Sequence, residues 1–199
     1  ITARSTFSEL QNLRKSAQNL LPVALEDPEC ITIESHEALG AVADHDEIKA
    51  KFPHTYGKPR VGIKKGTKRK RKVEALRIGV VLSGGQAPGG HNVIAGIYDY
   101  VKKISPSSSV IGFLNGPIGV YTGNYCEIDD DFMDAYRNSG GFDMIGSGRH
   151  KIEKPEQFEA SLRYAKELNL DGLVVIGGDD SNTNAAILAE YFASKNSKT

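Results

Sequence analysis

A glycine-rich segment at residues 84–90 is the part of the chain that most directly suggests chemistry. It reads Gly-Gly-Gln-Ala-Pro-Gly-Gly and separates an apolar run from a helical pattern. Glycines let a backbone approach a ligand closely, and a helix N-terminus presents unpaired N–H groups to an anion. The spacing is neither G-x-G-x-x-G nor a Walker loop, because Gln86 takes the second glycine position and no Lys-Ser/Thr follows. A tight turn is the alternative, but four glycines and a proline in seven residues favour a phosphate site.

Two adjacent carboxylates follow a second pair of glycines. Residues 177–181 read Gly-Gly-Asp-Asp-Ser and come directly after another apolar run. One aspartate could cap the helix that follows, since carboxylates favour a helix N-terminus, but a cap explains two of them less well. Mg²⁺ in proteins is held by one or two carboxylates together with phosphate oxygens. Asp179 is therefore the candidate metal ligand.

Basic residues in a third segment could bind a phosphoryl group. Residues 146–151 read Gly-Ser-Gly-Arg-His-Lys. Arg149 offers several N–H donors in a planar fork, and Lys151 adds a point charge. His150 could act as a general base, but no nearby residue would orient its ring, so we do not select it. A plain basic loop before a helix is the alternative interpretation of this segment.

The elements that must position these segments alternate between strand and helix. Short apolar runs predict buried strands at 77–82, 110–114 and 172–176, and helical spacing predicts helices at 91–103, 129–138, 155–168 and 181–193. This alternation predicts a doubly wound, mostly parallel α/β sheet with helices on both faces. Ligands bind such sheets at the carboxyl ends of the strands, where both glycine loops would lie.

The first part of the chain has a different character. Residues 1–59 predict a partly helical arm, with capping-box spacing between Thr6 and Glu9. Residues 60–72 carry eight basic side chains and no acid. A nuclear signal or nucleic-acid patch would fit that charge, but no aromatic residues interleave with it. We therefore predict an exposed basic linker at 60–76 and no nucleic-acid partner.

Composition narrows the class of protein. The 199 residues hold 25 basic and 25 acidic side chains, so net charge demands no strongly charged partner. The two cysteines, Cys30 and Cys126, exclude a disulfide scaffold and a zinc ribbon. No apolar run approaches a membrane span, and no signal pattern opens the chain. We expect a cytoplasmic protein without a membrane partner.

Taken in order, the three motifs resemble the phosphofructokinase family. They are Gly-Gly-Gln-Ala-Pro-Gly-Gly-His-Asn at 84–92, Ser-Gly-Arg-His-Lys at 147–151 and Gly-Gly-Asp-Asp-Ser-Asn-Thr-Asn at 177–184. More narrowly, the chain is similar to the pyrophosphate-dependent 6-phosphofructokinases of the long, plant- and spirochaete-like group. The likeness is strongest from 77 to 193 and extends less specifically into the arm.

This resemblance implies an activity and roles for particular residues. The family transfers a phosphoryl group reversibly from pyrophosphate to fructose 6-phosphate, giving fructose 1,6-bisphosphate, and requires Mg²⁺. Asp179 matches the magnesium ligand. Asp180 stands where ATP-using members have glycine; it would exclude the nucleotide and help to stabilise the transferring phosphoryl group. The implied donor-binding residues are Gly84, Gly85, Arg149 and Ser181.

One family segment is absent from the sequence. The strand end resembling Thr-Ile-Asp-Gly-Asp, whose first aspartate is the general base, would lie beyond Thr199, as would the sugar-phosphate residues. We therefore expect 77–199 to be an incomplete donor-binding lobe of a phosphofructokinase, inactive alone. At full length it would form a homo-oligomer or pair with a related subunit.

Other functions remain as alternatives. A regulatory, non-catalytic subunit of the same family would tend to have altered donor loops, whereas here the Gly84, Arg149 and Asp179 motifs are intact. An ATP-using sugar or lipid kinase is disfavoured by Asp180, because that position is glycine in such loops. A dinucleotide-binding dehydrogenase lacks support because its glycine spacing is missing.

Overall fold

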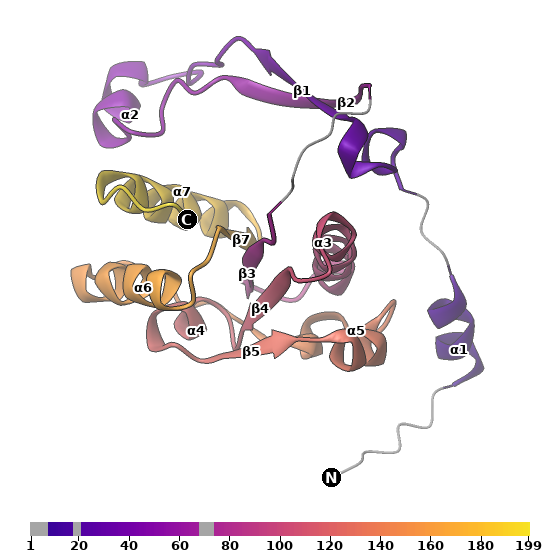
Figure 1. Ribbon diagram of the computed structural model, residues 1–199. Coiled ribbons are helices and arrows are strands. Elements are labelled where there is room, and N and C mark those ends of the chain that lie inside the picture. Colours follow the sequence, from indigo (N-terminus) through magenta and orange to yellow (C-terminus); the bar gives the residue numbers. More distant parts are fainter. Residues whose placement is uncertain (1–7, 18–20, 68–73) are drawn as a thin grey trace.

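A computed structural model describes residues 8–17, 21–67 and 74–199 of the chain (Figure 1). Its main body is a five-stranded sheet with β3 (Arg77–Ser83) in the centre. Strand β3 pairs in parallel with β4 (Ser109–Phe113) along one edge and with β7 (Gly172–Ile176) along the other. The two-residue β6 (Ser147–Gly148) joins the end of β3 in parallel, and β5 (Tyr125–Ile128) pairs antiparallel with β4.

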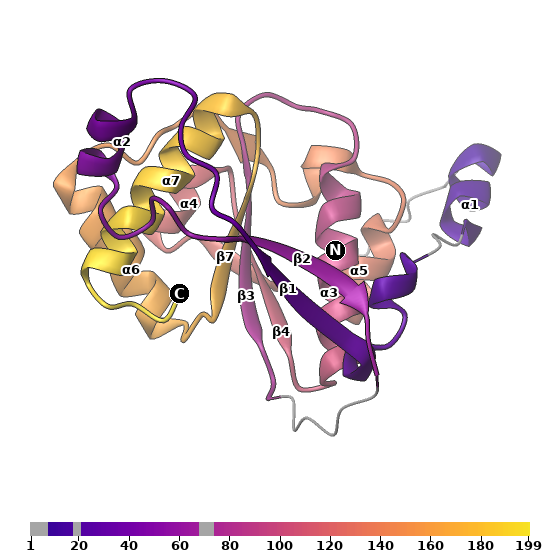
Figure 2. The same ribbon diagram turned by 90° about the horizontal axis from the view of Figure 1, so that it is seen from above.

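Helices cover both faces of this sheet, as Figures 1 and 2 show. One face carries α3 (Gly90–Ile104), α5 (Asp130–Tyr136) and the short helix η3 (Gly141–Met144). The other carries α4 (Pro117–Thr122), α6 (Pro155–Glu167) and α7 (Asp179–Ser194). Because side chains alternate along a strand, Val80 of β3 packs in the first core and Val81 in the second. The prediction of a doubly wound, mostly parallel sheet is confirmed.

Most predicted elements occupy the expected residues, with two useful differences. The strands at 77–82, 110–114 and 172–176 and the helices near 91 and 155 are confirmed within one or two residues. Asp129 caps α5 by accepting a hydrogen bond of 2.8 Å from the N–H of Phe132, but α5 ends at Tyr136 rather than at 138. Helix α7 begins at Asp179, two residues before the predicted start. Asp179 and Asp180 therefore form its first turn.

Two elements between β4 and α5 were not expected. Helix α4 and strand β5 lie in a stretch interrupted by Asn115, Gly116 and Gly123, all of which adopt positive φ. Such turn residues obscure any regular hydrophobic period. The antiparallel β5 makes the sheet mixed at that edge.

An antiparallel hairpin precedes the sheet and corrects the prediction of a linker at 60–76. Strand β1 (Ile31–His36) pairs with β2 (Arg60–Lys65), placing Ile33 opposite Ile63. Two of the three basic side chains of β2 form ion pairs: Lys64 pairs with Glu34, and Lys65 with Glu26. Within the predicted linker, residues 60–65 are therefore strand, and 68–73 lie outside the described residues.

The predicted arm also contains four short helices among its described residues. They are α1 (Glu9–Ser16), η1 (Val23–Leu25), η2 (Pro28–Cys30) and α2 (His45–Lys51). The predicted first helix is thus confirmed at 9–16, while its proposed cap, Thr6, lies outside the described residues. No helix in the described ranges is long and apolar enough to cross a membrane.

The arm is attached to α7 through Glu190. This carboxylate accepts hydrogen bonds from the N–H groups of His54 (2.9 Å) and Thr55 (3.0 Å) and from the Thr55 hydroxyl (2.8 Å). Only 13% of the Glu190 side chain is exposed. Partial burial raises the pKa of Glu190, but the hydrogen bonds from His54 and Thr55 lower it more, and the net shift is downward.

Replacing Glu190 with alanine is expected to release residues 54–55 from α7. Their amides lose a charged acceptor, so hydrogen exchange there should become roughly tenfold faster. Because the pKa of Glu190 is lowered on folding, its contribution is present above the usual carboxyl pKa and is lost as the pH falls through the lowered value. Mass-spectrometric exchange of the intact chain measures this, with Glu159→Ala on exposed α6 surface as the control. Equal exchange in the two variants would rule out the attachment.

Candidate functional site

The three segments singled out in the sequence meet at one small cleft. It lies where β3, β6 and β7 end, at the carboxyl edge of the sheet. Its volume is about 80 Å³. The residues that line it are Ser83, Gly84, Arg149, His150, Lys151, Asp180, Ser181 and Asn184. Residues about 100 positions apart in the sequence thus line one cleft, because parallel strands end on the same side.

The first glycine loop is fixed to the Arg149 segment by its backbone. The N–H of Gly84 donates to the carbonyl of Gly148 at 2.8 Å, and the hydroxyl of Ser147 donates to the carbonyl of Gly84 at 3.2 Å. Gly84 has φ +98°, a conformation that a side chain would strain. The loop is therefore held in a shape that only glycine readily adopts.

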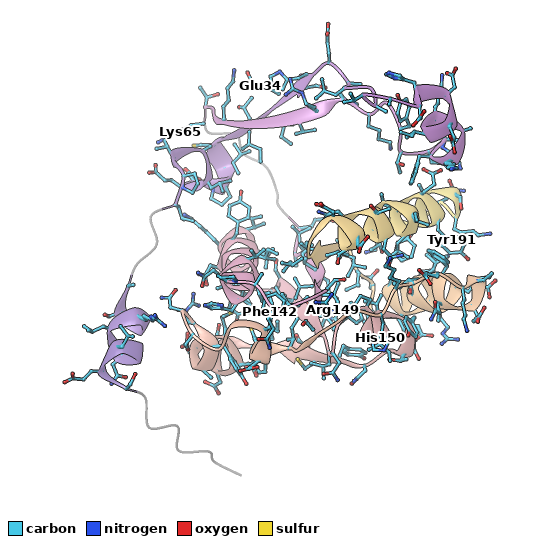
Figure 3. The ribbon with its side chains drawn as sticks, turned by 180° about the vertical axis from the view of Figure 1, so that it is seen from behind. Glu34, Lys65, Phe142, Arg149, His150 and Tyr191 are labelled. Atoms are coloured by element: carbon cyan, nitrogen blue, oxygen red, sulfur yellow. The ribbon has the colours of Figure 1, made fainter. Side chains whose placement is uncertain are left out.

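Arg149 lies directly against this loop. A Cβ atom added to Gly85 would sit 2.9 Å from Nη2 of Arg149, so glycine is what lets the guanidinium approach. Arg149 is exposed, and in the described part of the chain it forms no ion pair. Figure 3 shows Arg149 and His150 next to each other, on the side of α7 away from the hairpin. The guanidinium donors are thus available to an anion in the cleft.

The N-terminus of α7 forms the opposite wall. Its N-cap is Gly178, which supplies no side-chain cap, and both Asp179 and Asp180 are exposed. Asp180 lines the cleft, and its Oδ1 lies 4.0 Å from Nζ of Lys151. Asp179, the predicted metal ligand, lies beside the cleft but is not among the residues that line it. The helix N-terminus adds a partial positive charge at this wall.

The carboxylates at this site could bind Mg²⁺ only together with phosphate oxygens of a ligand. Across the described residues, no three His, Cys, Asp or Glu side chains gather closely enough to hold a metal by themselves. Mg²⁺ commonly keeps several waters and is bound by one or two carboxylates plus substrate phosphate oxygens. The exposed carboxylate of Asp179, beside an anion-sized cleft, is compatible with that arrangement.

Three residues that line the cleft were not selected from the sequence: Ser83, His150 and Asn184. Asn184 lines the cleft and exchanges two hydrogen bonds with the backbone of Ile152. Its spacing of four residues after Asp180, on the same helix face, was the available signal. His150 also lines the cleft, and no described side chain hydrogen-bonds to its ring, so it lacks the orienting partner of a general base.

A larger groove continues from the cleft. Its volume is about 400 Å³, and it shares Lys151, Asp180 and Asn184 with the cleft. Its other lining residues are Ile152, Glu153, Phe158, Thr183 and Ile187. Asp180 thus stands where the small polar cleft opens into a partly apolar groove.

The residues that build this site lie within the part of the chain that matches a known protein family. A family model described as "Phosphofructokinase" matches residues 77–196. A protein of Porphyromonas gingivalis named "Pyrophosphate--fructose 6-phosphate 1-phosphotransferase" is 51% identical over 187 residues, 94% of this chain and 34% of that protein. "Subunit beta 1" of the same-named enzyme from Arabidopsis thaliana is 49% identical over 195 residues, 98% of this chain and 34% of that subunit.

A solved structure supports the fold. The pyrophosphate-dependent phosphofructokinase from Nitrosospira multiformis aligns with a TM-score of 0.52 and 19% identity, over 61% of this chain and 31% of that chain. At that identity the likeness concerns the fold alone. The chain spans about a third of the length of the two relatives named above.

Proposed function

The chain belongs to the phosphofructokinase family, and we propose that the whole protein transfers a phosphoryl group reversibly between pyrophosphate and fructose 6-phosphate, with this chain supplying the donor site. The observation that carries the proposal is the cleft in which Gly84, Arg149 and Asp180 meet. The names of the two relatives give the donor and the acceptor. The identity of the acceptor rests on those names, since none of the residues that line the cleft is assigned to bind it.

The size and charge of the cleft suit pyrophosphate. A volume of about 80 Å³ lies well below the roughly 300–1,000 Å³ of sites for drug-sized ligands. Arg149 supplies positive charge, and the start of α7 directs backbone N–H groups toward an anion. Phosphoryl transfer depends mainly on positioning and charge stabilisation, which these groups can provide.

Asp180 would select between donors. A nucleotide that reached from the cleft into the larger groove would bring its additional phosphate past the Asp180 carboxylate. Two negative charges at short range give specificity by repulsion. Pyrophosphate has no additional phosphate to bring past Asp180 into the groove.

Asp179 would hold Mg²⁺ together with oxygens of the donor. When bound, the metal neutralises charge on the phosphate oxygens. Arg149 would orient one phosphoryl group against the Gly84-Gly85 loop, and Ser181 would meet the donor at the first turn of α7. Following the subunit name of the Arabidopsis relative, we propose that the whole protein assembles with a copy of itself or a related subunit.

Donor selection can be tested by calorimetric titration of the whole protein with Mg·pyrophosphate and Mg·ATP. The unchanged protein is expected to bind pyrophosphate and not ATP, and Asp180→Gly is expected to gain ATP binding. Asp131→Gly, the same change at the second residue of α5, should alter neither affinity. ATP binding equal to that of pyrophosphate in the unchanged protein would refute the role of Asp180. Binding of neither donor would favour a non-catalytic subunit.

A further inference from the structure

Lys151 is the charged neighbour of Asp180. Its Nζ lies 4.0 Å from Oδ1 of the aspartate, and the two side chains are 47% and 91% exposed. Neither has another charged partner among the described residues. Arg149, the other cation of the cleft, lies toward Gly85 and the first glycine loop. The site therefore separates its cations: one lies at the loop and one at Asp180.

The backbone at Lys151 is held in place through the next residue, Ile152. Asn184 accepts a hydrogen bond of 3.0 Å from the N–H of Ile152, and its amide donates one of 2.7 Å to the carbonyl of the same residue. The Ile152 side chain is buried in the second core. Since Asn184 lies one turn after Asp180 on the same helix face, these contacts hold the backbone beside Lys151 next to Asp180.

A carboxylate that repels a nucleotide also repels pyrophosphate. The donor brings several negative charges into a cleft that already contains Asp180. Like charges at short range lower affinity for every anion unless a cation offsets them. Lys151 is the cation placed to do this, and it lines both the cleft and the groove that begins at Asp180.

We propose that Lys151 is the counterion that lets Asp180 stand beside an anionic donor. It partly offsets the Asp180 charge so that pyrophosphate can bind, while the charge that remains still repels the additional phosphate of a nucleotide. Lys151 acts through Asp180 and is thus a positioning residue. This inference rests on the proposed function, because it concerns the same donor site.

A double-mutant cycle tests the proposal. The whole protein, Lys151→Met and Lys151→Arg are titrated with Mg·pyrophosphate, each with Asp180 intact and as Asp180→Asn. With Asp180 intact, Lys151→Met is expected to weaken binding about fivefold, the upper range for one exposed ion pair. Lys151→Arg keeps the charge and should stay within about twofold. In the Asp180→Asn background, Lys151→Met should cost less than about twofold, because no charge remains to be offset.

Each other outcome has a distinct meaning. Equal losses in both backgrounds would overturn the proposal, since Lys151 would then contact the phosphate independently of Asp180. Unweakened binding in Lys151→Met would also overturn the proposal. In both cases the proposed function still stands if the unchanged protein binds pyrophosphate. Absence of pyrophosphate binding in the unchanged protein would overturn both the Lys151 proposal and the proposed function. Lys166→Met, an exposed lysine on α6, is the matched control and should bind normally.

Discussion

Replacing Asp179 with asparagine in the whole protein is expected to lower kcat with Mg·pyrophosphate by about 10²–10³-fold, the usual effect of removing one charge-stabilising group from a transition state. Asp179 is the first residue of α7 and its side chain is exposed, so the change leaves the cores intact. The amide keeps the shape of the side chain but loses the charge that Mg²⁺ requires. Initial rates at saturating donor, acceptor and Mg²⁺ measure the effect.

Asp131→Asn provides the matched control for this prediction. Asp131 is also an exposed carboxylate in the first turn of a helix, α5, but that helix lies on the other face of the sheet. It should keep the kcat of the unchanged protein, and both variants should keep its melting temperature. A normal kcat in Asp179→Asn would mean that another group holds the metal.

Gly177→Ala is expected to lower the free energy of unfolding by about 2–3 kcal/mol, because it overpacks the junction between two loops. The added Cβ would lie 2.5 Å from the carbonyl oxygen of Ser83 and 2.6 Å from Oγ of Ser181. Ser83 ends the central strand, which is paired on both edges and cannot easily withdraw. The alanine must therefore push the start of α7 away from β3 and open the cleft between them.

The neighbouring glycine separates this packing effect from a general intolerance of alanine. A Cβ on Gly178 would meet nothing within 4 Å, and Gly178 has an ordinary φ of −85°. Replacing glycine with alanine at this N-cap is expected to cost less than about 1 kcal/mol. Thermal denaturation of both variants makes the comparison. Equal destabilisation would show that contact with Ser83 does not decide the choice of glycine at 177.

The central fold could be predicted because its signals are local. Strands β3 and β7 are continuous apolar runs ended by pairs of glycines, and the rule for parallel sheets then brings their loops together. The β1–β2 hairpin could not be predicted in this way. Its strands lie more than twenty residues apart, and the lysines of β2 resemble those of a solvated linker until their ion pairs with Glu34 and Glu26 are seen.

The site was predicted at the level of its loops and less well at the level of individual side chains. The pattern predicted the start of this helix at 181, but α7 begins at Asp179, and that start decides how the first-turn side chains are directed around the helix axis. Asp180 lines the cleft and Asp179 lies beside it. The contribution of Asn184 depends on a contact with Ile152 that no local pattern contains.

The attachment of the arm to Glu190 has a practical consequence for preparing shortened versions of this protein. Helix α7 carries the two aspartates of the proposed donor site at its start and Glu190 about three turns later, where Glu190 is hydrogen-bonded to residues 54–55 of the arm (Figure 1). Trimming the chain to the family-matched residues would leave a carboxylate that is now largely covered without its three hydrogen-bond donors. Affinities measured on such a trimmed protein would describe a helix that has lost its outer support. Ligand screening should therefore retain residues 45–56.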